Sequence, residues 1–280
     1  MLKKLLCLIF LLGILLPTFT KGQDISLFTQ INGRYDFTFI GNTLNPSENN
    51  NFSPTFLYTT SSATLNLSSD DRIERAYLYW AGSGTGDTNV KLNGVDITPD
   101  RLSNVTGTFS NFDYFSAFKD ITAQVQSFGN GTYTLSDFDI NSLVDEYAEN
   151  ATQFAGWAIL VVYENPNLTL NQINIYQGLE ALSPNLPLGI IDYMTIQLNN
   201  LYLISNTGAK IGFIAWEGDR FIQESERLSF TANNVTNVLS NPLNPSNNAF
   251  NGTNTETNAT NLYNMDLDVY SIENYIVPGT

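Results

Sequence analysis

Histidine is absent from this 280-residue chain, and its one cysteine, Cys7, lies near the N-terminus. Without histidine, the Ser-His-Asp and Cys-His arrangements in which an imidazole activates a nucleophile cannot form. Most zinc and copper sites also depend on histidine or cysteine ligands. The two absences exclude most nucleophilic and transition-metal chemistry, while catalysis by carboxylates and binding of calcium stay open.

Basic residues are scarce as well. The chain has 12 Lys and Arg against 27 Asp and Glu, which gives a formal net charge of −15 at pH 7. Nucleic acids and anionic lipids are recruited by basic patches, so this charge argues against either as a partner. The simplest effect of such acidity is to keep the protein soluble.

The first 23 residues predict a secretory signal peptide. Lys3 and Lys4 form its positive start, an apolar run spans Leu5–Leu16, and Pro17–Gln23 is a polar exit. The run is too short to cross a membrane. A cysteine that carries a lipid anchor follows the apolar run, whereas Cys7 lies near its start. We therefore interpret Cys7 as an ordinary residue of the signal peptide. The signal predicts export to the extracellular space or the outer surface of the cell.

Residues 24–280 are the predicted mature part. No stretch in them is apolar enough to predict an integral membrane span. They contain no cysteine, so the fold cannot depend on disulfides. The mature part is long enough to bury a substantial core, and no clean linker divides it. We therefore expect a single domain.

Short runs that alternate between apolar and polar residues are typical of β-strands. Three such runs predict strands at 73–80, 194–198 and 210–216. In the first run we expect one face to carry Ala76, Leu78 and Trp80 and the other to carry Tyr77 and Tyr79. Residues 156–163 are apolar almost without interruption, which predicts a central strand covered on both faces.

The sequence predicts one tight turn and two short helices in addition to the strands. Asn93 and Gly94 tolerate the positive φ angles of a tight turn, so residues 90–98 predict a hairpin. Apolar residues at spacings of three and four predict a short amphipathic helix over about 115–127, ended by Gly129. A weaker helical pattern covers 142–148.

Residues 233–264 contain 12 asparagines in 32 positions. This composition favours turns over regular strand ladders and predicts a long Asn-rich loop. Together the patterns predict an all-β fold of about a dozen strands, an antiparallel β-sandwich or jelly roll with one or two short helices.

Carboxylates are the one catalytic chemistry that the composition leaves open. Glycoside hydrolysis uses two acids that face each other across a sugar bond. The acids available for this role are Glu164, Glu217, Asp219 and Glu224, with Glu217 directly after Trp216. An acid at a strand end is more often simply solvated, so a carboxylate glycoside hydrolase or lyase is an alternative and not the leading hypothesis.

Calcium binding is a second possibility, because export leads to a calcium-rich exterior and this chain is rich in oxygen ligands. Asp137, Asp139 and Asn141 place three oxygen-bearing side chains at alternate positions and form the predicted metal site. The spacing is not that of an EF-hand, because Ser142 stands in place of the required glycine and Ala148 in place of the final Glu. Further acid pairs are Asp70 with Asp71 and Asp266 with Asp268. The competing interpretation is exposed acids that discourage edge-to-edge pairing.

Aromatic side chains offer flat amphipathic faces that suit sugars or protein surfaces. Trp80 and Trp157 are expected in the core because of their strand context. Tyr79 and Trp216 are the predicted ligand-binding residues, although most aromatics in strands pack against neighbours.

Several stretches resemble the N-terminal module of gliding-motility-associated bacterial surface proteins, which are exported by type IX secretion. The order of the segments carries the resemblance. They are Arg75–Gly82 (RAYLYWAG), Val90–Gly94 (VKLNG), Asp120–Thr122 (DIT), Gly129–Tyr133 (GNGTY), Gly156–Glu164 (GWAILVVYE), Asn244–Gly252 (NPSNNAFNG) and Tyr263–Asp268 (YNMDLD). The likeness covers most of residues 25–277, and the central segments also resemble galactose-binding-like jelly rolls.

The resemblance implies an adhesin or a structural surface polymer and no catalytic residues. Members continue beyond the position of Thr280 into further modules and a sorting domain, so it also implies a chain truncated at its C-terminus. The leading hypothesis is a non-enzymatic adhesion or recognition module that binds a surface glycan or protein. A structural segment of a self-associating surface filament is a third alternative.

Overall fold

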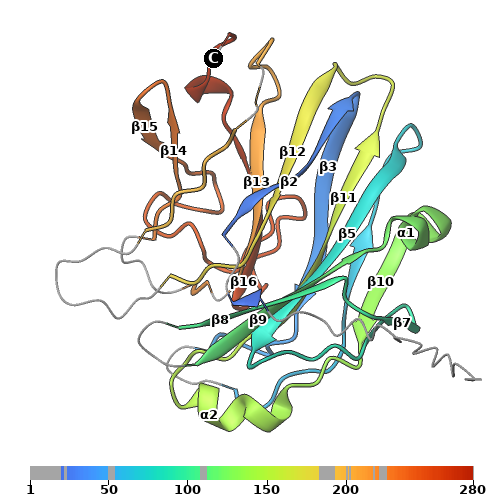
Figure 1. The fold of residues 1–280 in the computed structure, drawn as a ribbon, viewed down its shortest axis with the longest axis vertical. Coiled ribbons are helices and arrows are strands. Elements are labelled where there is room, and N and C mark those ends of the chain that lie inside the picture. The colour runs from blue at the N-terminus through green and yellow to red at the C-terminus, as the bar shows by residue number, and fades with distance from the viewer. Residues whose placement is uncertain are drawn as a thin grey trace, which may run out of the picture.

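The computed structural model describes residues 20–21, 24–49, 54–107, 112–182, 193–199, 201, 203–216, 218–220 and 226–279. Most of the predicted signal peptide lies outside these residues. Strands in several antiparallel sheets dominate the described chain, so the predicted all-β sandwich class is confirmed (Figure 1).

A six-stranded sheet forms the middle of the molecule. Its strands, in spatial order, are β1 (Thr20–Lys21), β8 (Arg101–Thr106), β9 (Asp113–Asp120), β5 (Arg72–Ser83), β11 (Ala155–Glu164) and β3 (Tyr35–Thr43). All neighbours are antiparallel except β1 and β8. Residues 73–80 and 156–163 therefore lie in adjacent strands, with Trp80 paired opposite Trp157.

A four-stranded sheet covers one face of this middle sheet. Its order is β4 (Ser61–Leu65), β10 (Gly131–Ser136), β6 (Val90–Leu92) and β7 (Val95–Ile97), and helix α1 (Thr122–Phe128) packs on the same side. Trp80 and Trp157 lie in the core between the two sheets with no exposed surface, as predicted. The face formed by Ala76, Leu78 and Trp80 points into this core.

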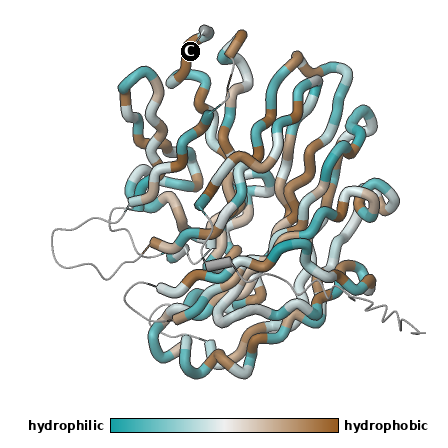
Figure 2. Tube along the Cα trace, in the orientation of Figure 1, coloured by the Kyte–Doolittle hydropathy of each residue, from teal (hydrophilic) through white to brown (hydrophobic). Residues whose placement is uncertain are grey.

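Two strand pairs cover the opposite face. They are β2 (Ser26–Gly33) with β12 (Asn171–Gln177), and β13 (Lys210–Trp216) with β16 (Met265–Ser271). Tyr77 and Tyr79 point into this second core with Leu160 and Val162 of β11. Hydrophobic residues are concentrated along the middle strands (Figure 2). Because cores form on both of its faces, β11 is the doubly covered strand that its unbroken apolar run predicts.

The predicted hairpin at 90–98 is confirmed as β6 and β7. Asn93 and Gly94 join the strands with φ angles of 51° and 78°. The weaker helix is confirmed as a 3₁₀ turn at Asn141–Leu143 followed by α2 (Val144–Ala148).

The predicted helix over 115–127 is wrong in its first half. Residues 113–120 form β9, which pairs with both β5 and β8. The spacing of Phe115 and Phe118 predicted that they share one helical face. In the structure they point to opposite faces of the middle sheet, into its two hydrophobic cores. Pairing with two neighbouring strands outweighs the helical spacing. The helix occupies only Thr122–Phe128 and ends before Gly129, as expected.

The strand predicted at 194–198 is also wrong. Residues 193–199 form no ladder in the structure, and Ile196 keeps 38% of its surface exposed. The alternation there marks no buried face because no sheet packs over it.

The Asn-rich segment contains one strand that its composition does not predict. Asn233 and Asn234, both at positive φ, turn β14 (Ser229–Ala232) into β15 (Val235–Val238). Residues 239–264 then contain no strand but only turns and isolated bridges, as a long loop would. A 3₁₀ turn at Glu273–Tyr275 follows β16.

Candidate functional site

Tyr79 lies in β5 on the face covered by β2 and β12. Its hydroxyl accepts a hydrogen bond from Gln177 Nε2 at 2.5 Å, and its ring packs 5.4 Å from the ring of Phe118. Burial raises the pKa of the phenol. The side chain is largely enclosed by its own fold, and its assignment as a ligand-binding residue stays a prediction.

Trp216 ends β13 and is also packed. Its ring stacks on Phe154 with 6.3 Å between ring centroids and an interplanar angle of 16°. A Cβ atom on Gly156 would lie 3.2 Å from the indole, so this glycine makes room for it. Tyr79 and Trp216 pack against the same core cluster, yet neither presents an open aromatic face. Ligand binding by Trp216 also stays a prediction.

The predicted metal residues are joined to other partners. Asp137 pairs with Lys91, with Nζ 2.5 Å from Oδ2. Asp139 Oδ1 accepts hydrogen bonds from the main-chain and side-chain nitrogens of Asn141, and these bonds lower the pKa of the Asp139 carboxyl. Asn141 Oδ1 accepts the N–H of Leu57 at 2.8 Å. The contacts tie this loop to its neighbours, and metal binding by it stays a prediction.

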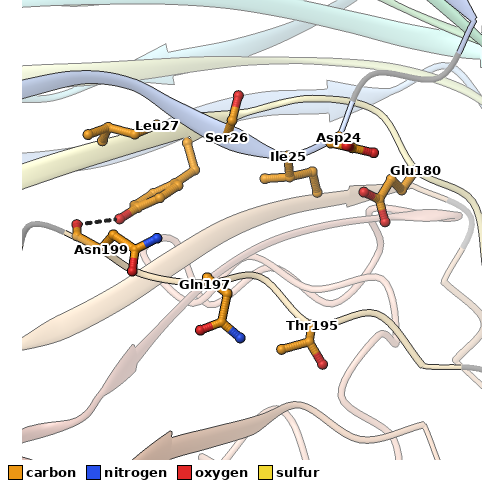
Figure 3. Close-up of a pocket in the computed structure, with 9 residues that line it drawn as sticks. Asp24, Ile25, Ser26, Leu27, Glu180, Thr195, Gln197 and Asn199 are labelled. Atoms are coloured by element: carbon orange, nitrogen blue, oxygen red, sulfur yellow. Dashed lines mark hydrogen bonds between the residues drawn. The ribbon is translucent and has the colours of Figure 1, made fainter.

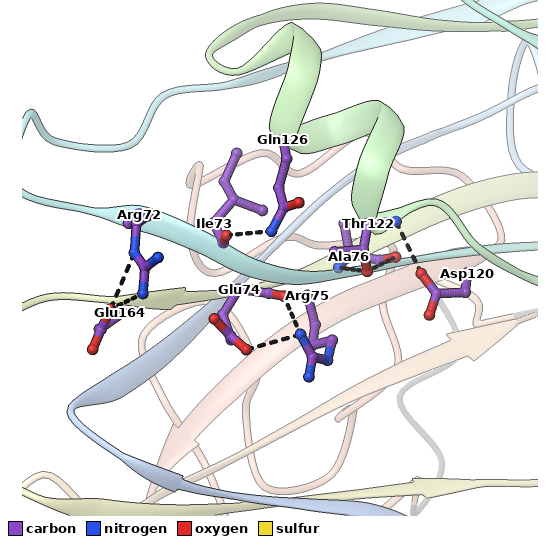
Figure 4. Close-up of polar contacts among 9 residues, drawn as sticks. All are labelled: Arg72, Ile73, Glu74, Arg75, Ala76, Asp120, Thr122, Gln126 and Glu164. Carbon is purple, nitrogen blue, oxygen red and sulfur yellow. Dashed lines mark hydrogen bonds and ion pairs between the residues drawn. The ribbon is translucent and has the colours of Figure 1, made fainter.

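Of the acids considered for catalysis, Glu164 makes an ion pair with Arg72 across the β5–β11 ladder (Figure 4). Figure 4 also shows Glu74 paired with Arg75. In both pairs the side chains are partly exposed, and each carboxylate is paired with an arginine. Asp219 is buried, and Glu217 and Glu224 lie outside the described residues.

The structure contains a pocket of about 380 Å³ beside the start of β2 and the end of β12 (Figure 3). One wall is the first part of β2, and the segment 193–199 forms the facing wall. The Tyr176 hydroxyl donates to the Asn199 carbonyl oxygen at 2.9 Å and holds this segment against β12. The lining residues are Asp24, Ile25, Ser26, Leu27, Tyr176, Glu180, Thr195, Gln197 and Asn199.

The pocket is lined by groups that donate and accept hydrogen bonds, two acids among them. Ser26, Thr195 and Gln197 offer hydroxyl and amide groups, Asp24 and Glu180 offer acceptors, and Tyr176 adds an aromatic ring. Sequence reasoning missed this site, because its walls come from segments far apart in the chain and carry no motif.

Buried acids form a second feature. Asp266 and Asp268 in β16, which the sequence offered as a further acid pair for calcium, have no exposed surface, so they are not the exposed acids of the competing interpretation. Burial raises the pKa of Asp268 to about 6 and that of Asp266 well above its usual value. Period-two spacing does place both side chains on one face of the strand, but only the packing of residues 239–264 over that face buries them.

Among the described residues, no group of three or more Asp, Glu, Cys or His side chains is already spaced to hold a metal ion. No helix in the described ranges has the length and apolar character needed to cross a membrane. Comparisons with protein-family models, with curated proteins and with solved structures returned no match.

Proposed function

We propose that this chain is an exported, non-enzymatic recognition module that works in adhesion at a bacterial cell surface and binds a neutral glycan. The signal-like N-terminus and the resemblance to gliding-motility surface proteins support export and adhesion. The chain's acidity supports a neutral ligand, because an anionic one would be repelled.

The pocket between β2, β12 and residues 193–199 is the observation that carries the proposal. Sugars present hydroxyls that both donate and accept hydrogen bonds, together with apolar C–H faces. Asp24 and Glu180 can accept from such hydroxyls, the Gln197 amide can donate to them, and the Tyr176 ring can pack against a C–H face.

The two acids of the pocket favour binding over hydrolysis. A glycosidase needs one carboxyl kept protonated by a shielded environment, next to a second that stays charged. Asp24 and Glu180 are both exposed. Neither has the shielding that a general acid needs, so the pocket is better suited to holding a sugar than to cleaving one.

A glycan array probed with the purified protein tests the proposal. We expect binding to neutral oligosaccharides, weakened about tenfold or more in the Gln197→Ala and Glu180→Gln variants, since each substitution removes hydrogen bonds to the sugar. Gln126→Ala is the matched control, because Gln126 is exposed on α1, which packs on the opposite face of the middle sheet. Unchanged binding in both pocket variants, or release of free sugar by the wild-type protein, would contradict the proposal.

A further inference from the structure

Four acids from separate parts of the chain lie around the turn at 218–220. Glu48 follows β3, Asp219 follows β13, Glu226 precedes β14, and Asp266 lies in β16. We call these four residues the carboxylate cluster. Glu48 and Asp219 each keep 9% of their surface exposed, Asp266 keeps none, and Glu226 is half-buried.

Main-chain hydrogen bonds place the acids together. Glu48 Oε2 accepts the N–H of Arg220 at 3.1 Å, which brings Glu48 to the turn that carries Asp219. The carbonyl oxygen of Glu226 accepts the N–H of Ala249 at 3.1 Å, next to Asn248. The Asn248 amide in turn donates to the Arg220 carbonyl oxygen at 3.0 Å.

Asp266 reaches the same place from β16. Its Oδ1 accepts three main-chain N–H groups, from Asn251, Gly252 and Thr253, at 2.9 to 3.0 Å. Its Oδ2 faces Gly218, where a Cβ atom would lie only 2.4 Å from that oxygen. Asp266 is thus fixed by one oxygen and directs the other at the turn that precedes Asp219.

Each acid of the cluster has one buried oxygen without a hydrogen-bond donor. These atoms are Glu48 Oε1, Asp219 Oδ1, Glu226 Oε2 and Asp266 Oδ2, and the neighbouring amides of Asn248 and Asn251 each add an unpartnered Oδ1. The described residues contain 10 buried side-chain polar atoms without a partner, and more than half of them are these oxygens. All are acceptors, so the local need is for positive charge or for protons.

The pKa shifts of these acids also indicate a need for positive charge or protons. Burial raises the pKa of Glu226 to about 7, and the nearby charge of Asp219 adds to the effect. Burial also raises the pKa of Glu48, and Asp219 again contributes. Arg220 acts against this at Glu48, first through the hydrogen bond from its main-chain N–H and last through its charge, and its guanidinium donates to the Thr260 carbonyl oxygen. Buried carboxylates that repel one another are costly without a cation among them.

We propose that the carboxylate cluster binds a calcium ion. Calcium takes six to eight oxygen ligands from carboxylates, amides and carbonyls in flexible geometry, and the cluster offers carboxylate and amide oxygens from irregular segments. Zinc is disfavoured because the chain has no histidine and its one cysteine is Cys7. Magnesium requires a stricter octahedron and keeps its waters.

Since the acids are not yet spaced around one point, binding would draw their side chains inward. The site shares no residue with the glycan pocket and does not depend on the proposed function. Its effect would be to tie residues 239–264 to the segments that follow β3 and β13. Calcium would thereby stabilise the part of the fold that has the fewest strands.

The experiment is calorimetric titration of the purified protein with calcium chloride, together with thermal melts in calcium or in a chelator. We expect one ion per chain and a melting temperature higher by roughly 5 °C in calcium. Asp219→Asn and Glu226→Gln keep side-chain shape but remove charge, and we expect each to weaken binding by about tenfold or more. Asp139→Asn tests the other predicted metal site and should bind as the wild type does. Glu146→Gln is the matched control, because Glu146 is an exposed acid of α2 outside both sites.

Three results would overturn the proposal. The first is no binding at millimolar calcium. The second is loss of binding in Asp139→Asn but not in Asp219→Asn. The third is a melting temperature that falls with rising pH equally with and without calcium, which would show that the acids hold protons. If Asp219→Asn does not fold, the wild-type stoichiometry and the Glu226→Gln variant, whose side chain is only half-buried, decide the matter.

Discussion

Asparagine has two roles in this chain. At positions 93, 233, 234, 258 and 264 it adopts positive φ and makes turns that most residues resist. Asparagine side chains are also buried and bond other segments, and Asn264 has both roles: its amide donates to Asn49 Oδ1 at 2.8 Å, and Asn45 donates to Asn264 Oδ1 at 3.1 Å. The Asn-rich region is therefore held by side-chain hydrogen bonds where strand ladders are missing.

The buried carboxyl of Asp268 gives a pH dependence at the scale of one residue. Its pKa is raised to about 6, first by burial, so the folded state binds a proton that the unfolded state has released. The resulting stabilisation is full below about pH 4 and is lost as the pH rises through about 6. We expect a loss on the order of 3 kcal/mol in the free energy of unfolding over that range.

Denaturant titrations in chelator at pH 4, 5, 6 and 7 measure this loss. Asp268→Asn removes the titrating group, so the difference in stability between wild type and variant should change by that amount between pH 4 and 6. Parallel curves for the two proteins would show that Asp268 does not titrate as expected.

At the scale of elements, strand pairing decides what local spacing leaves open. Phe115, Phe118 and Ile121 have helical spacing, but β9 gains hydrogen-bonded neighbours on both sides and buries Phe115 and Phe118 in different cores. Helix α1 then keeps only the residues that follow. Conversely, the hairpin of β6 and β7 was predictable, because its tight turn requires positive φ and both turn residues, Asn93 and Gly94, tolerate it.

The β6–β7 turn allows a test of this local requirement. Gly94 has φ of 78°, and a Cβ atom there would meet nothing within 4 Å, so Gly94→Ala changes only backbone strain. We expect it to cost roughly 1 kcal/mol. Gly94→Asn should cost less, because asparagine tolerates this conformation. The urea midpoints of the three proteins measure the effect, and equal midpoints would contradict it.

At the scale of the whole molecule, the middle sheet is covered on both faces, and this arrangement leaves recognition to the outer layers and their loops. The glycan pocket lies where β2, β12 and residues 193–199 meet. The carboxylate cluster lies where the Asn-rich loop meets β16. Neither site uses the middle sheet, whose side chains fill the two cores.

Export is the prediction for the whole chain. Expressed in a bacterium with an intact secretion system, the protein should leave the cytoplasm and lose about 23 residues. Intact-mass analysis of the exported protein measures the cleavage. Replacing Leu11 and Leu12 with arginine should block export, because the apolar run would be broken. Exported protein that still carries Lys3 and Lys4 would contradict the prediction.

The sequence by itself determined the β class, the doubly covered strand at 156–163, the tryptophans in the core and the hairpin at Asn93 and Gly94. These follow from alternation, unbroken apolar runs and turn chemistry, which are local properties of a few successive residues. Only the tertiary structure decided that 113–120 is a strand, that 193–199 is not, and that Glu48, Asp219, Glu226 and Asp266 come together. Such contacts join segments far apart in the chain, as when Glu48 accepts the N–H of Arg220, 172 residues later. No local pattern encodes which distant neighbour will pack beside a given side chain.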